Sequence, residues 1–313
     1  MRESHHFPQA LQASKLMVHT STSELTQNAN EVRDRIDAAL RTYTELAAGC
    51  PSRLREAMRY SLLAPGKRLR PMLTLMAAEA CGGEVDAALP AACAVEMVHA
   101  YSLVHDDLPA MDDDDLRRGQ PTCHKKFGEA LAILAGDALL TLAFEVLAKG
   151  VRPPEVAAAC CAALAEAAGA CHLVGGQADD VSAESCGGID TLESIHHRKT
   201  GAMIRVSLRL GAMVSGADGR QTAALEEYGR KLGIAFQITD DLLDVRGEEA
   251  RLGKRVGKDS DRGKLTFPGL LGVDRSLKRA EQLIEEACKA LEPLGPRADR
   301  LEALALYVLE RNR

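Results

Sequence analysis

Aspartates gather at two places in otherwise apolar sequence. The stretch "LVHDDLPAMDDDDLRRGQP", residues 103–121, holds six aspartates within ten positions and continues into Arg117 and Arg118. A second stretch, "AFQITDDLLDV", residues 235–245, again pairs aspartates, and on a helix its glutamine and three aspartates share one broad stripe. Acidic runs usually form a solvated surface. Because apolar sequence flanks both runs, we expect these carboxylates to face inward.

Inward-facing carboxylates restrict the chemistry that the two runs can perform. Burial of an unpaired charge is costly, so each carboxylate must take up a proton, pair with an arginine or bind a cation. Clustered hard oxygen ligands suit Mg²⁺, which takes one or two carboxylates together with phosphate oxygens. We therefore predict a site in which Mg²⁺ bridges the aspartates to a phosphate or diphosphate.

Four basic clusters can supply the positive charge that a diphosphate needs. They are "GKRLRP" (66–71), the pair Arg117 and Arg118, "HHRKTG" (196–201) and "GKRVGKDSDRGK" (253–264). Arginine forms forked hydrogen bonds to phosphate, whereas lysine acts as a compact charge. The sequence lacks a G-x-x-x-x-G-K-[ST] loop, which excludes a P-loop nucleotide enzyme.

The elements that position these residues are helices almost throughout. Segments such as "EVRDRIDAALRTYTELA" and "SLKRAEQLIEEACKALEPL" repeat apolar residues at intervals of three and four, and alanine and leucine are abundant. Breaks fall at short turn sequences such as "CGGE" and "KGVRPP", and none of them has the length of a domain linker. We predict an all-α domain, a single bundle of about ten or more helices.

Composition and charge exclude several classes of protein. The chain has 313 residues, 46% of them hydrophobic, and a net charge of −6. A nucleic-acid-binding domain is usually basic, so we expect no nucleic-acid partner. Nine cysteines without a C-x-x-C pair indicate reduced thiols, and we expect a cytoplasmic protein. No run of roughly 18 strongly apolar residues occurs, so we expect no transmembrane segment.

The aspartate motifs and basic clusters together resemble the trans-isoprenyl diphosphate synthase family, and within it the bacterial farnesyl diphosphate synthases. The first motif reads Asp106-Asp107-x-x-x-x-Asp112 followed by "DDDLRRG", and the second reads Asp240-Asp241-x-x-Asp244. The likeness extends from about residue 29 to the terminal "YVLERNR", with five motifs in family order. It implies a catalytic domain at residues 29–313. We interpret residues 1–28 as a flexible N-terminal tail; their few acidic residues and several Ser and Thr leave an organelle transit peptide as the alternative.

The resemblance implies the isoprenoid synthase fold and a homodimer, in which the two aspartate motifs face each other across a deep central cavity. It also implies three Mg²⁺ ions in each site with diphosphate bound, and Mn²⁺ as a substitute. Two ions would bind the first motif through Asp106 and Asp112, and one would bind the second through Asp240. The other motif aspartates would support the metal through water or hydrogen bonds: Asp107, Asp241 and Asp244.

The basic clusters take two roles under the same resemblance. The allylic diphosphate would bind Arg117, Lys199, Lys254 and Lys264. Isopentenyl diphosphate would bind Lys67, Arg70, His99 and Arg118. The carbonyl of Thr200 and the side chain of Gln237 would point at the developing carbocation, and Lys199 is counted with them as catalytic.

Helix geometry supports the role of His99 in the cavity and raises a question about the role of Asp112 as a metal ligand. His99 precedes Asp106 by seven residues and shares its helix face, which favours a place in the cavity. In a regular helix Asp112 lies about 240° around from Asp106, whereas Asp113 returns to the same face. Pro109 gives the helix a reason to distort between them. We follow the resemblance and take Asp112 as the ligand, with Asp113 as the structural alternative. We interpret the other polar residues of these motifs as structural, paired or solvated: His105, His196, His197, Asp113, Asp114 and Asp115.

The implied activity is that of a short-chain trans-prenyltransferase, which condenses isopentenyl diphosphate with dimethylallyl and geranyl diphosphate to give farnesyl diphosphate (C15). Product length would depend on the tail pocket below the first motif, where Ser102 lies ~6 Å and Tyr101 ~7.5 Å along the helix from Asp106. In the family, a bulky aromatic at the position of Tyr101 resembles a floor that stops growth at fifteen carbons. The alternative interpretation is that Tyr101 is a packed core aromatic.

Three other functions remain open at this point. A geranylgeranyl diphosphate synthase (C20) is the nearest. A terpene cyclase usually replaces the second motif and lines its cavity with aromatics, whereas this chain keeps "DDLLD" and has 3% aromatic residues. A non-catalytic partner subunit often loses an aspartate motif, and this chain keeps both.

Overall fold

The computed structural model describes residues 22–46, 48–182, 188–246 and 265–310. Helices cover nearly all of this range, and its strands form one two-stranded hairpin. The predicted all-α bundle of about ten or more helices is therefore confirmed. The first 21 residues of the predicted N-terminal tail lie outside the described range, and the first described helix begins at Thr22, so the boundary at residue 29 stays a prediction.

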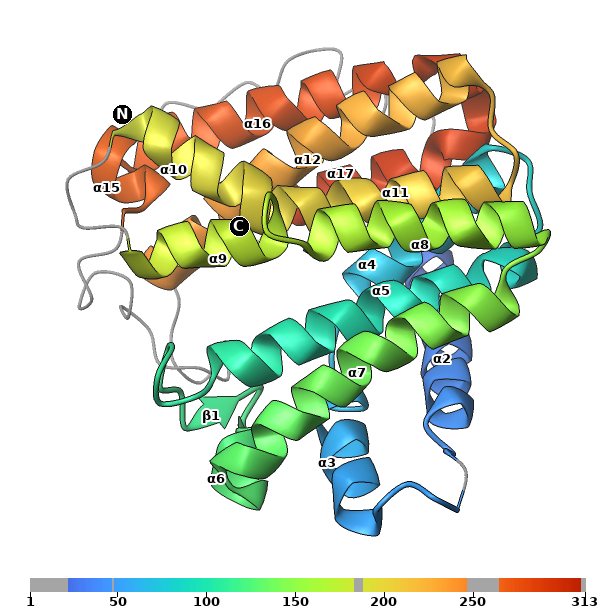
Figure 1. The fold of residues 1–313 in the computed structure, drawn as a ribbon. Helices are drawn as coiled ribbons and strands as arrows, with labels where there is room; N and C mark the ends of the chain where they lie inside the picture. Colours follow the sequence, from blue (N-terminus) through green and yellow to red (C-terminus); the bar gives the residue numbers. More distant parts are fainter. Residues whose placement is uncertain (1–21, 47, 183–187, 247–264, 311–313) are drawn as a thin grey trace.

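The helices form two layers, seen one above the other in Figure 1. The lower layer contains α2 (Thr22–Tyr43), α3 (Ser52–Leu62), α4 (Leu69–Ala80), α5 (Val85–Asp106), α6 (Cys123–Phe127) and α7 (Glu129–Gly150). The upper layer begins with α8 (Pro154–Ala168), α9 (Leu173–Ser182), α10 (Ile189–His196), the π-helical turn η1 (His197–Gly201), α11 (Ala202–Val214) and α12 (Gly219–Arg246). It is completed by α15 (Phe267–Leu271), α16 (Val273–Ala290), the 3₁₀ turn η2 (Glu292–Ala298) and α17 (Asp299–Glu310).

Two apolar cores fill these layers, and α4 and α11 contribute to both. One core lies among α2, α3, α5, α7 and α8, and the other among α10, α12, α16 and α17. Within α4, Leu75 belongs to the first core and Leu73 to the second. Gly211 allows α11 to approach α4 closely, because a Cβ there would lie 2.2 Å from the carbonyl oxygen of Thr74. The two helices that carry the aspartate motifs, α5 and α12, are therefore joined through one tightly packed helix pair.

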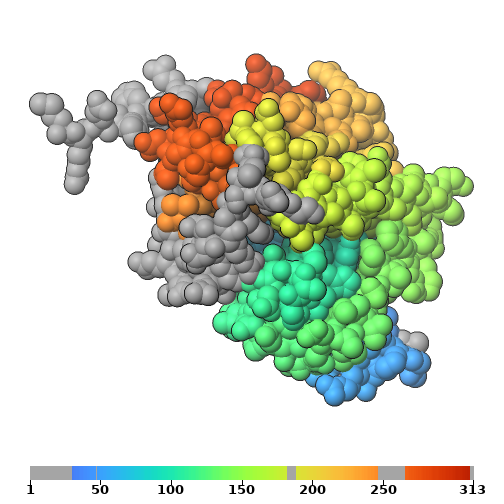
Figure 2. Space-filling view, turned by 60° about the vertical axis from the view of Figure 1, so that its left-hand side comes forward, coloured from blue at the N-terminus to red at the C-terminus, as the bar shows by residue number. Residues whose placement is uncertain are grey.

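The motif-bearing ends of these two helices lie at the same end of the molecule (Figure 1). α5 packs against α4, α7 and α11 and is apolar on most faces, so the first motif follows a helix that is fixed along its length. α12 packs against α11 and α16. Figure 2 brings this end forward: the teal and green residues of α5 and α7 lie below, and the yellow residues of α9 and α10 lie above.

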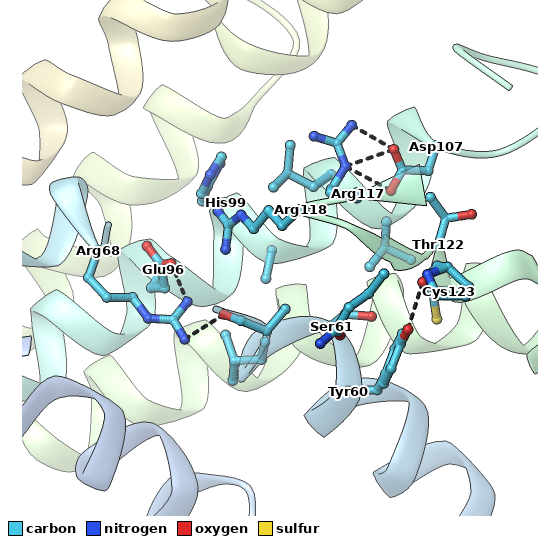
Figure 3. Close-up of a pocket in the computed structure, with 17 residues that line it drawn as sticks. Tyr60, Ser61, Arg68, Glu96, His99, Asp107, Arg117, Arg118, Thr122 and Cys123 are labelled. Atoms are coloured by element: carbon cyan, nitrogen blue, oxygen red, sulfur yellow. Dashed lines mark hydrogen bonds and ion pairs between the residues drawn. The ribbon is translucent and has the colours of Figure 1, made fainter. Parts of the chain in front are cut away.

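A β-hairpin follows the first motif. Its strands are β1 (Leu116–Arg117) and β2 (Gln120–Pro121), paired antiparallel. The two turn residues, Arg118 and Gly119, have φ angles of 54° and 76°. Tight hairpin turns of this length favour positive φ at both positions. Tyr60 of α3 donates a hydrogen bond to the carbonyl oxygen of Pro121 at 2.7 Å, which fastens the hairpin and its two arginines to α3 (Figure 3).

Three helical segments in the described range are long and apolar enough to cross a membrane, judged by length and composition alone. They are Val85–Asp106, Glu129–Gly150 and Pro154–Val181. In its most apolar window the first is 72% buried inside the protein, whereas the others are 44% and 39% buried. Isolated charged residues interrupt these segments, so none of them is a long uninterrupted apolar run. The expectation of no transmembrane segment stays a prediction.

Candidate active site

Helix α5 ends at Asp106, and the rest of the first motif is a loop that folds back on the helix end. The backbone amide of Asp112 donates a hydrogen bond to the carbonyl oxygen of Asp106 at 2.8 Å, which returns Asp112 to the neighbourhood of Asp106. Asp113 adopts a positive φ of 48° and is exposed. Asp113 does not return to the face of Asp106 as it would in a continuous helix, because α5 has ended before Pro109.

The environment of the Asp106 carboxyl is that of a cation ligand. Burial raises its pKa from 3.8 to about 6, while Lys199 opposes the rise and Asp112 adds to it. Within the described part of the chain, its side chain forms no hydrogen bond or ion pair. A divalent cation would supply the missing positive charge, and a donor set made of carboxylate oxygens fits Mg²⁺.

Arg117 of the hairpin forms a bidentate ion pair with Asp107. Its Nε and Nη2 donate to the two carboxylate oxygens at 2.6–2.9 Å (Figure 3). Asp107 is 3% exposed, so the pair is partly shielded from water and holds the hairpin against the end of α5. This pair uses Nε and Nη2, so the Nη1 donors of Arg117 can serve an anionic ligand.

A pocket of about 40 Å³ lies between α3, α5 and the hairpin (Figure 3). We call it the arginine pocket; its basic lining residues are Arg68, His99, Arg117 and Arg118. Burial lowers the pKa of His99 well below the ordinary value of 6.5, and the nearby guanidinium groups, Arg70 foremost, lower it further. The His99 ring is therefore neutral near pH 7, and it can donate one hydrogen bond to an anion.

Arg118 docks on the loop that carries Lys67. Its Nη1 donates to the carbonyl oxygen of Pro65 at 2.9 Å. A Cβ at Gly66 would lie 2.3 Å from the same nitrogen, so glycine at this position is required for the approach. Lys67 itself is exposed. The hairpin and the "GKRLRP" loop, far apart in sequence, thus lie side by side.

Arg70 lies on the far side of this loop, in the first turn of α4, and its Nε is buried without a hydrogen-bond partner among the described residues. Burial lowers the pKa of Arg70, and the carboxylates of Glu96 and Asp240 oppose that effect. An unpaired buried donor is costly. A bound anion would satisfy it, in agreement with a role in diphosphate binding.

A buried ion-pair network positions the same loop, and it was not predictable from the sequence. Arg68 has a positive φ of 49° and is 4% exposed. Its guanidinium donates to Asp37 at 2.7 Å, to Glu96 at 2.9 Å and to the carbonyl oxygen of Ala64 at 3.0 Å. Because Arg68 faces inward, its neighbour Lys67 faces solvent and Arg70 falls near the arginine pocket.

A second cavity, of about 140 Å³, lies where α9, α10, η1 and α12 meet. We call it the Lys199 cavity; its polar lining residues are Asp180, His196, Lys199, Thr200, Gln237, Asp241 and Thr266. The three predicted catalytic residues therefore lie together, next to one aspartate of the second motif. Lys199 donates to Asp180 at 2.8 Å.

Lys199 and Thr200 belong to η1, which is a π-helical turn. Such turns are rare and often occur at functional sites, because the widened turn shifts backbone carbonyls out of the regular helical pattern. Two glycines make room for it. A Cβ at Gly176 would lie 2.7 Å from the backbone nitrogen of Lys199, and a Cβ at Gly233 would lie 3.1 Å from the Cα of Gly201.

The second motif stays within α12, and its stripe faces inward as the helical pattern indicates. Asp241 and Asp244 are 5% and 7% exposed. One oxygen of Asp241 accepts a hydrogen bond from the backbone amide of Phe267 at 2.9 Å. The Phe267 ring stacks on His196 of the Lys199 cavity, with ring centroids 5.7 Å apart. Asp241 therefore fixes part of the cavity wall in addition to any role towards metal.

Tyr101, the predicted chain-length residue, lies on α5, and His105 connects its ring to α7. It is buried, and its ring contacts His105 edge-on with centroids 5.7 Å apart. His105 Nε2 lies 3.0 Å from the carbonyl oxygen of Ile133, and a Cβ at Gly136 would lie 2.1 Å from Nε2. Ser102 donates to the carbonyl oxygen of His99 at 2.9 Å. Neither residue lines the arginine pocket or the Lys199 cavity.

Other sequence-based assignments fall outside these groups. Lys254 and Lys264, predicted to bind the allylic diphosphate, lie outside the described residues. Asp180 and His196 also line the Lys199 cavity; the sequence does not predict the first as a site residue, and it predicts a structural role for the second. The signal that could have found Asp180 is the glycine pair of "GGQADD", because glycines before an acidic residue on a helix indicate close approach of another backbone.

Similarity to known proteins decides the family. Residues 51–294 match the model of the polyprenyl synthetase family. The chain belongs to this family. A farnesyl diphosphate synthase of Escherichia coli (strain K12) is 49% identical over 267 residues, which cover 82% of this chain and 89% of that protein. A chloroplastic geranylgeranyl pyrophosphate synthase of Catharanthus roseus is 48% identical over 268 residues, which cover 84% of this chain and 75% of that protein.

A solved structure supports the same assignment. An FPP/GFPP synthase from Zymomonas mobilis superposes with a TM-score of 0.82 at 37% identity and covers 92% of this chain and 99% of that one. Relatives named for C15 and for C20 products are thus almost equally similar to this polyprenyl synthetase. The family, the isoprenoid synthase fold and a short-chain prenyltransferase activity, all expected from the aspartate motifs, are confirmed.

Proposed function

We propose that this polyprenyl synthetase makes farnesyl diphosphate (C15) by condensing isopentenyl diphosphate first with dimethylallyl diphosphate and then with geranyl diphosphate. The allylic C–O bond breaks and diphosphate leaves with the electron pair. The double bond of isopentenyl diphosphate then forms a C–C bond to the allylic carbon. Loss of a proton to the departed diphosphate restores a double bond, and the chain is five carbons longer.

Two positively charged regions support separate places for the two diphosphates. The arginine pocket, with neutral His99 and the unpaired Nε of Arg70 nearby, suits isopentenyl diphosphate, which keeps its diphosphate during the reaction. Arg117 and Lys199 both lower the pKa of Asp106 and therefore lie near the first motif, where they suit the allylic diphosphate. We expect Lys254 and Lys264 to complete that second place. Stabilisation of the leaving charge by ~1.4 kcal/mol increases the rate about tenfold.

The Lys199 cavity suits the developing carbocation. The widened η1 turn supports the assignment of the Thr200 carbonyl, whose partial negative charge would stabilise a cation, and Gln237 offers a second neutral oxygen. Asp180 holds Lys199 by an ion pair, which gives the ammonium group a fixed position in the cavity wall. The apolar wall of Leu192 and Ile195 excludes water, which would otherwise trap the cation.

We further propose three Mg²⁺ ions in each loaded site, two on Asp106 and Asp112 and one on Asp240, with Mn²⁺ as a substitute. When bound, Mg²⁺ neutralises the diphosphate and makes it a better leaving group. The raised pKa of Asp106 supports this assignment, because a buried carboxyl without a partner has a strong requirement for a cation.

The observation that favours C15 over longer products is the clamped Tyr101. Its ring contacts His105 edge-on, and His105 can lie against α7 because Gly136 has no side chain. A fixed aromatic ring this far below Asp106 limits the length of the prenyl tail.

The product assay tests the proposal. Purified protein is incubated with dimethylallyl diphosphate, isopentenyl diphosphate and Mg²⁺, and the hydrolysed alcohols are identified by gas chromatography. We expect farnesol as the main product and a shift to C20 or longer in Tyr101→Ala, whereas Tyr307→Ala, at an exposed tyrosine of α17, leaves the product unchanged.

A dominant C20 alcohol from the natural protein would assign it as a geranylgeranyl diphosphate synthase. Consumption of farnesyl diphosphate alone would indicate a cyclase, and activity only with another synthase would indicate a partner subunit.

We also propose a cytoplasmic homodimer with α7 at the interface. α7 has a mean hydropathy of 2.0 in its most apolar window but is only 44% buried there, and Ile133 and Leu134 are 44% and 53% exposed. An exposed apolar face of this kind is typical of a contact with a partner. We expect twice the mass of one chain by light scattering, and a monomer for Leu134→Glu. Recovery of the natural protein only with membranes would instead assign this face to lipid.

A further inference from the structure

A cluster of possible metal ligands lies beside the first motif, and the proposed reaction does not use it. It consists of Asp113 and Asp115, in the loop after the motif, and His124 of α6. One carboxylate oxygen of each aspartate and one ring nitrogen of His124 all lie within 4.8 Å of one another. Neither the arginine pocket nor the Lys199 cavity is lined by any of the three.

The His124 ring gives an independent reason to expect a ligand. The residue is 6% exposed, and its Nε2 is buried with no hydrogen-bond partner in the described range. The other ring nitrogen, Nδ1, lies 3.1 Å from the hydroxyl oxygen of Thr122. When Nδ1–H donates to that hydroxyl, Nε2 carries a free lone pair, which is costly to bury without a partner. Metal-binding histidines are commonly oriented in this way through their second nitrogen.

The donor set differs from that of the two aspartate motifs. One imidazole with two carboxylates is typical of zinc and related transition metals, whereas Mg²⁺ prefers oxygen donors and retains water. Ligand atoms at about 2.0–2.2 Å from tetrahedral zinc lie about 3.4 Å apart, so the cluster must close by a little over 1 Å. Asp113 and Asp115 are exposed and can make this change by side-chain rotation, while His124 stays in place.

Lys125 competes with a cation at this position. Its ammonium group lies 2.7 Å from Asp115, and the two side chains are 44% and 72% exposed. Exposed pairs of this kind contribute little to stability. A dication can therefore displace Lys125 or use the second oxygen of Asp115. Lys126 offers a matched control, because it lies over the ring of Tyr60, 3.9 Å from its centroid.

We propose that Asp113, Asp115 and His124 form a site for a zinc-type divalent cation, separate from the Mg²⁺ ligands Asp106 and Asp112. The site connects the loop after the first motif to α6 across the base of the hairpin. The backbone already makes one such connection, since the amide of Thr122 donates to the carbonyl oxygen of Asp115 at 2.9 Å. A bound cation adds a second connection and restrains the hairpin that carries Arg117 and Arg118.

Isothermal titration calorimetry of the full chain with Zn²⁺, in excess Mg²⁺ to occupy the oxygen-only sites, tests the proposal. We expect one Zn²⁺ per chain at this site. Asp115→Asn and His124→Gln should each weaken binding by at least about tenfold. Lys125→Gln should tighten binding severalfold because it removes the competing charge, whereas Lys126→Gln should leave it unchanged.

The variants distinguish this site from the motifs. Unchanged binding in Asp115→Asn would overturn the proposal, and so would loss of binding in the pair Asp106→Asn and Asp112→Asn, which would place the zinc at the first motif. The Asp115 side chain is exposed, so Asp115→Asn should have the same melting temperature as the natural protein. If His124→Gln does not fold, Asp113→Asn combined with Asp115→Asn decides the question. None of these outcomes depends on which prenyl product is made.

Discussion

The two aspartate motifs carry the same side chains on different kinds of backbone. In the first, α5 ends at Asp106, and a backbone hydrogen bond between Asp106 and Asp112 brings the last aspartate back. In the second, α12 continues through Asp244, and the helical repeat alone aligns the aspartates. The spacing accounts for the difference, because four intervening residues leave room for a turn whereas two fit within one turn of helix.

In both motifs a group from another part of the chain binds the second aspartate of the pair. This group is charged in the first motif, and the one seen in the second motif is neutral. Asp107 is bound by the guanidinium group of Arg117, which compensates its negative charge. Asp241 is bound by the neutral backbone amide of Phe267, which does not. The first motif is therefore partly neutralised before any ligand binds, whereas the hydrogen bond on Asp241 connects α12 to α15.

The largest expected effect tests whether the first motif acts as a loop. Asp112→Asn should lower kcat/KM by about 10²-fold or more, because it removes charge that stabilises the leaving diphosphate through the metal. Asp113→Asn should change it by less than about threefold, because Asp113 is exposed and lies after the end of α5. Steady-state kinetics in excess Mg²⁺ measures both. A larger loss of kcat/KM in Asp113→Asn than in Asp112→Asn would mean that the helix continues through Pro109 in the active enzyme.

A smaller effect is expected from the anchoring hydrogen bond of the second motif. Asp241→Ala leaves the buried amide of Phe267 without a partner and should lower the free energy of unfolding by about 1–3 kcal/mol. Asp241→Asn keeps an oxygen acceptor and should lower it by less than about 1 kcal/mol. Urea denaturation without Mg²⁺ provides the comparison. Equal losses in the two variants would show that charge, and not the hydrogen bond, is what Asp241 contributes to the fold.

The same contrast explains how much could be predicted from the sequence. The second motif was predictable because periodicity determines which residues of a helix share a face, and Asp241 and Asp244 are indeed buried. The helical class also followed from periodicity, whereas the family followed from the resemblance of the aspartate motifs and basic clusters. The π-helical turn of Lys199 and the inward turn of Arg68 were not predictable, since each depends on contacts between distant segments, with Gly176 in one case and Glu96 in the other. The cluster around His124 was not predictable either, because Asp113 and Asp115, its neighbours in space, are eleven and nine residues away in the sequence.

The smallest effect concerns the charge of Asp106, whose pKa in the folded protein is about 6 against an ordinary 3.8. A raised carboxyl pKa means that the protonated form is favoured by folding, so its contribution to stability is full below about pH 4 and is lost as the pH rises through about 6. Without metal at pH 7.5, Asp106→Asn should therefore be more stable than the natural protein by about 1 kcal/mol, after allowance for partial exposure, and equally stable at pH 4. Thermal melting in EDTA at the two pH values measures this difference, and Mg²⁺ with diphosphate should reverse it at pH 7.5, because only the natural carboxylate binds the metal. A variant that is no more stable than the natural protein at pH 7.5 in EDTA would mean that a partner, and not a cation, neutralises Asp106.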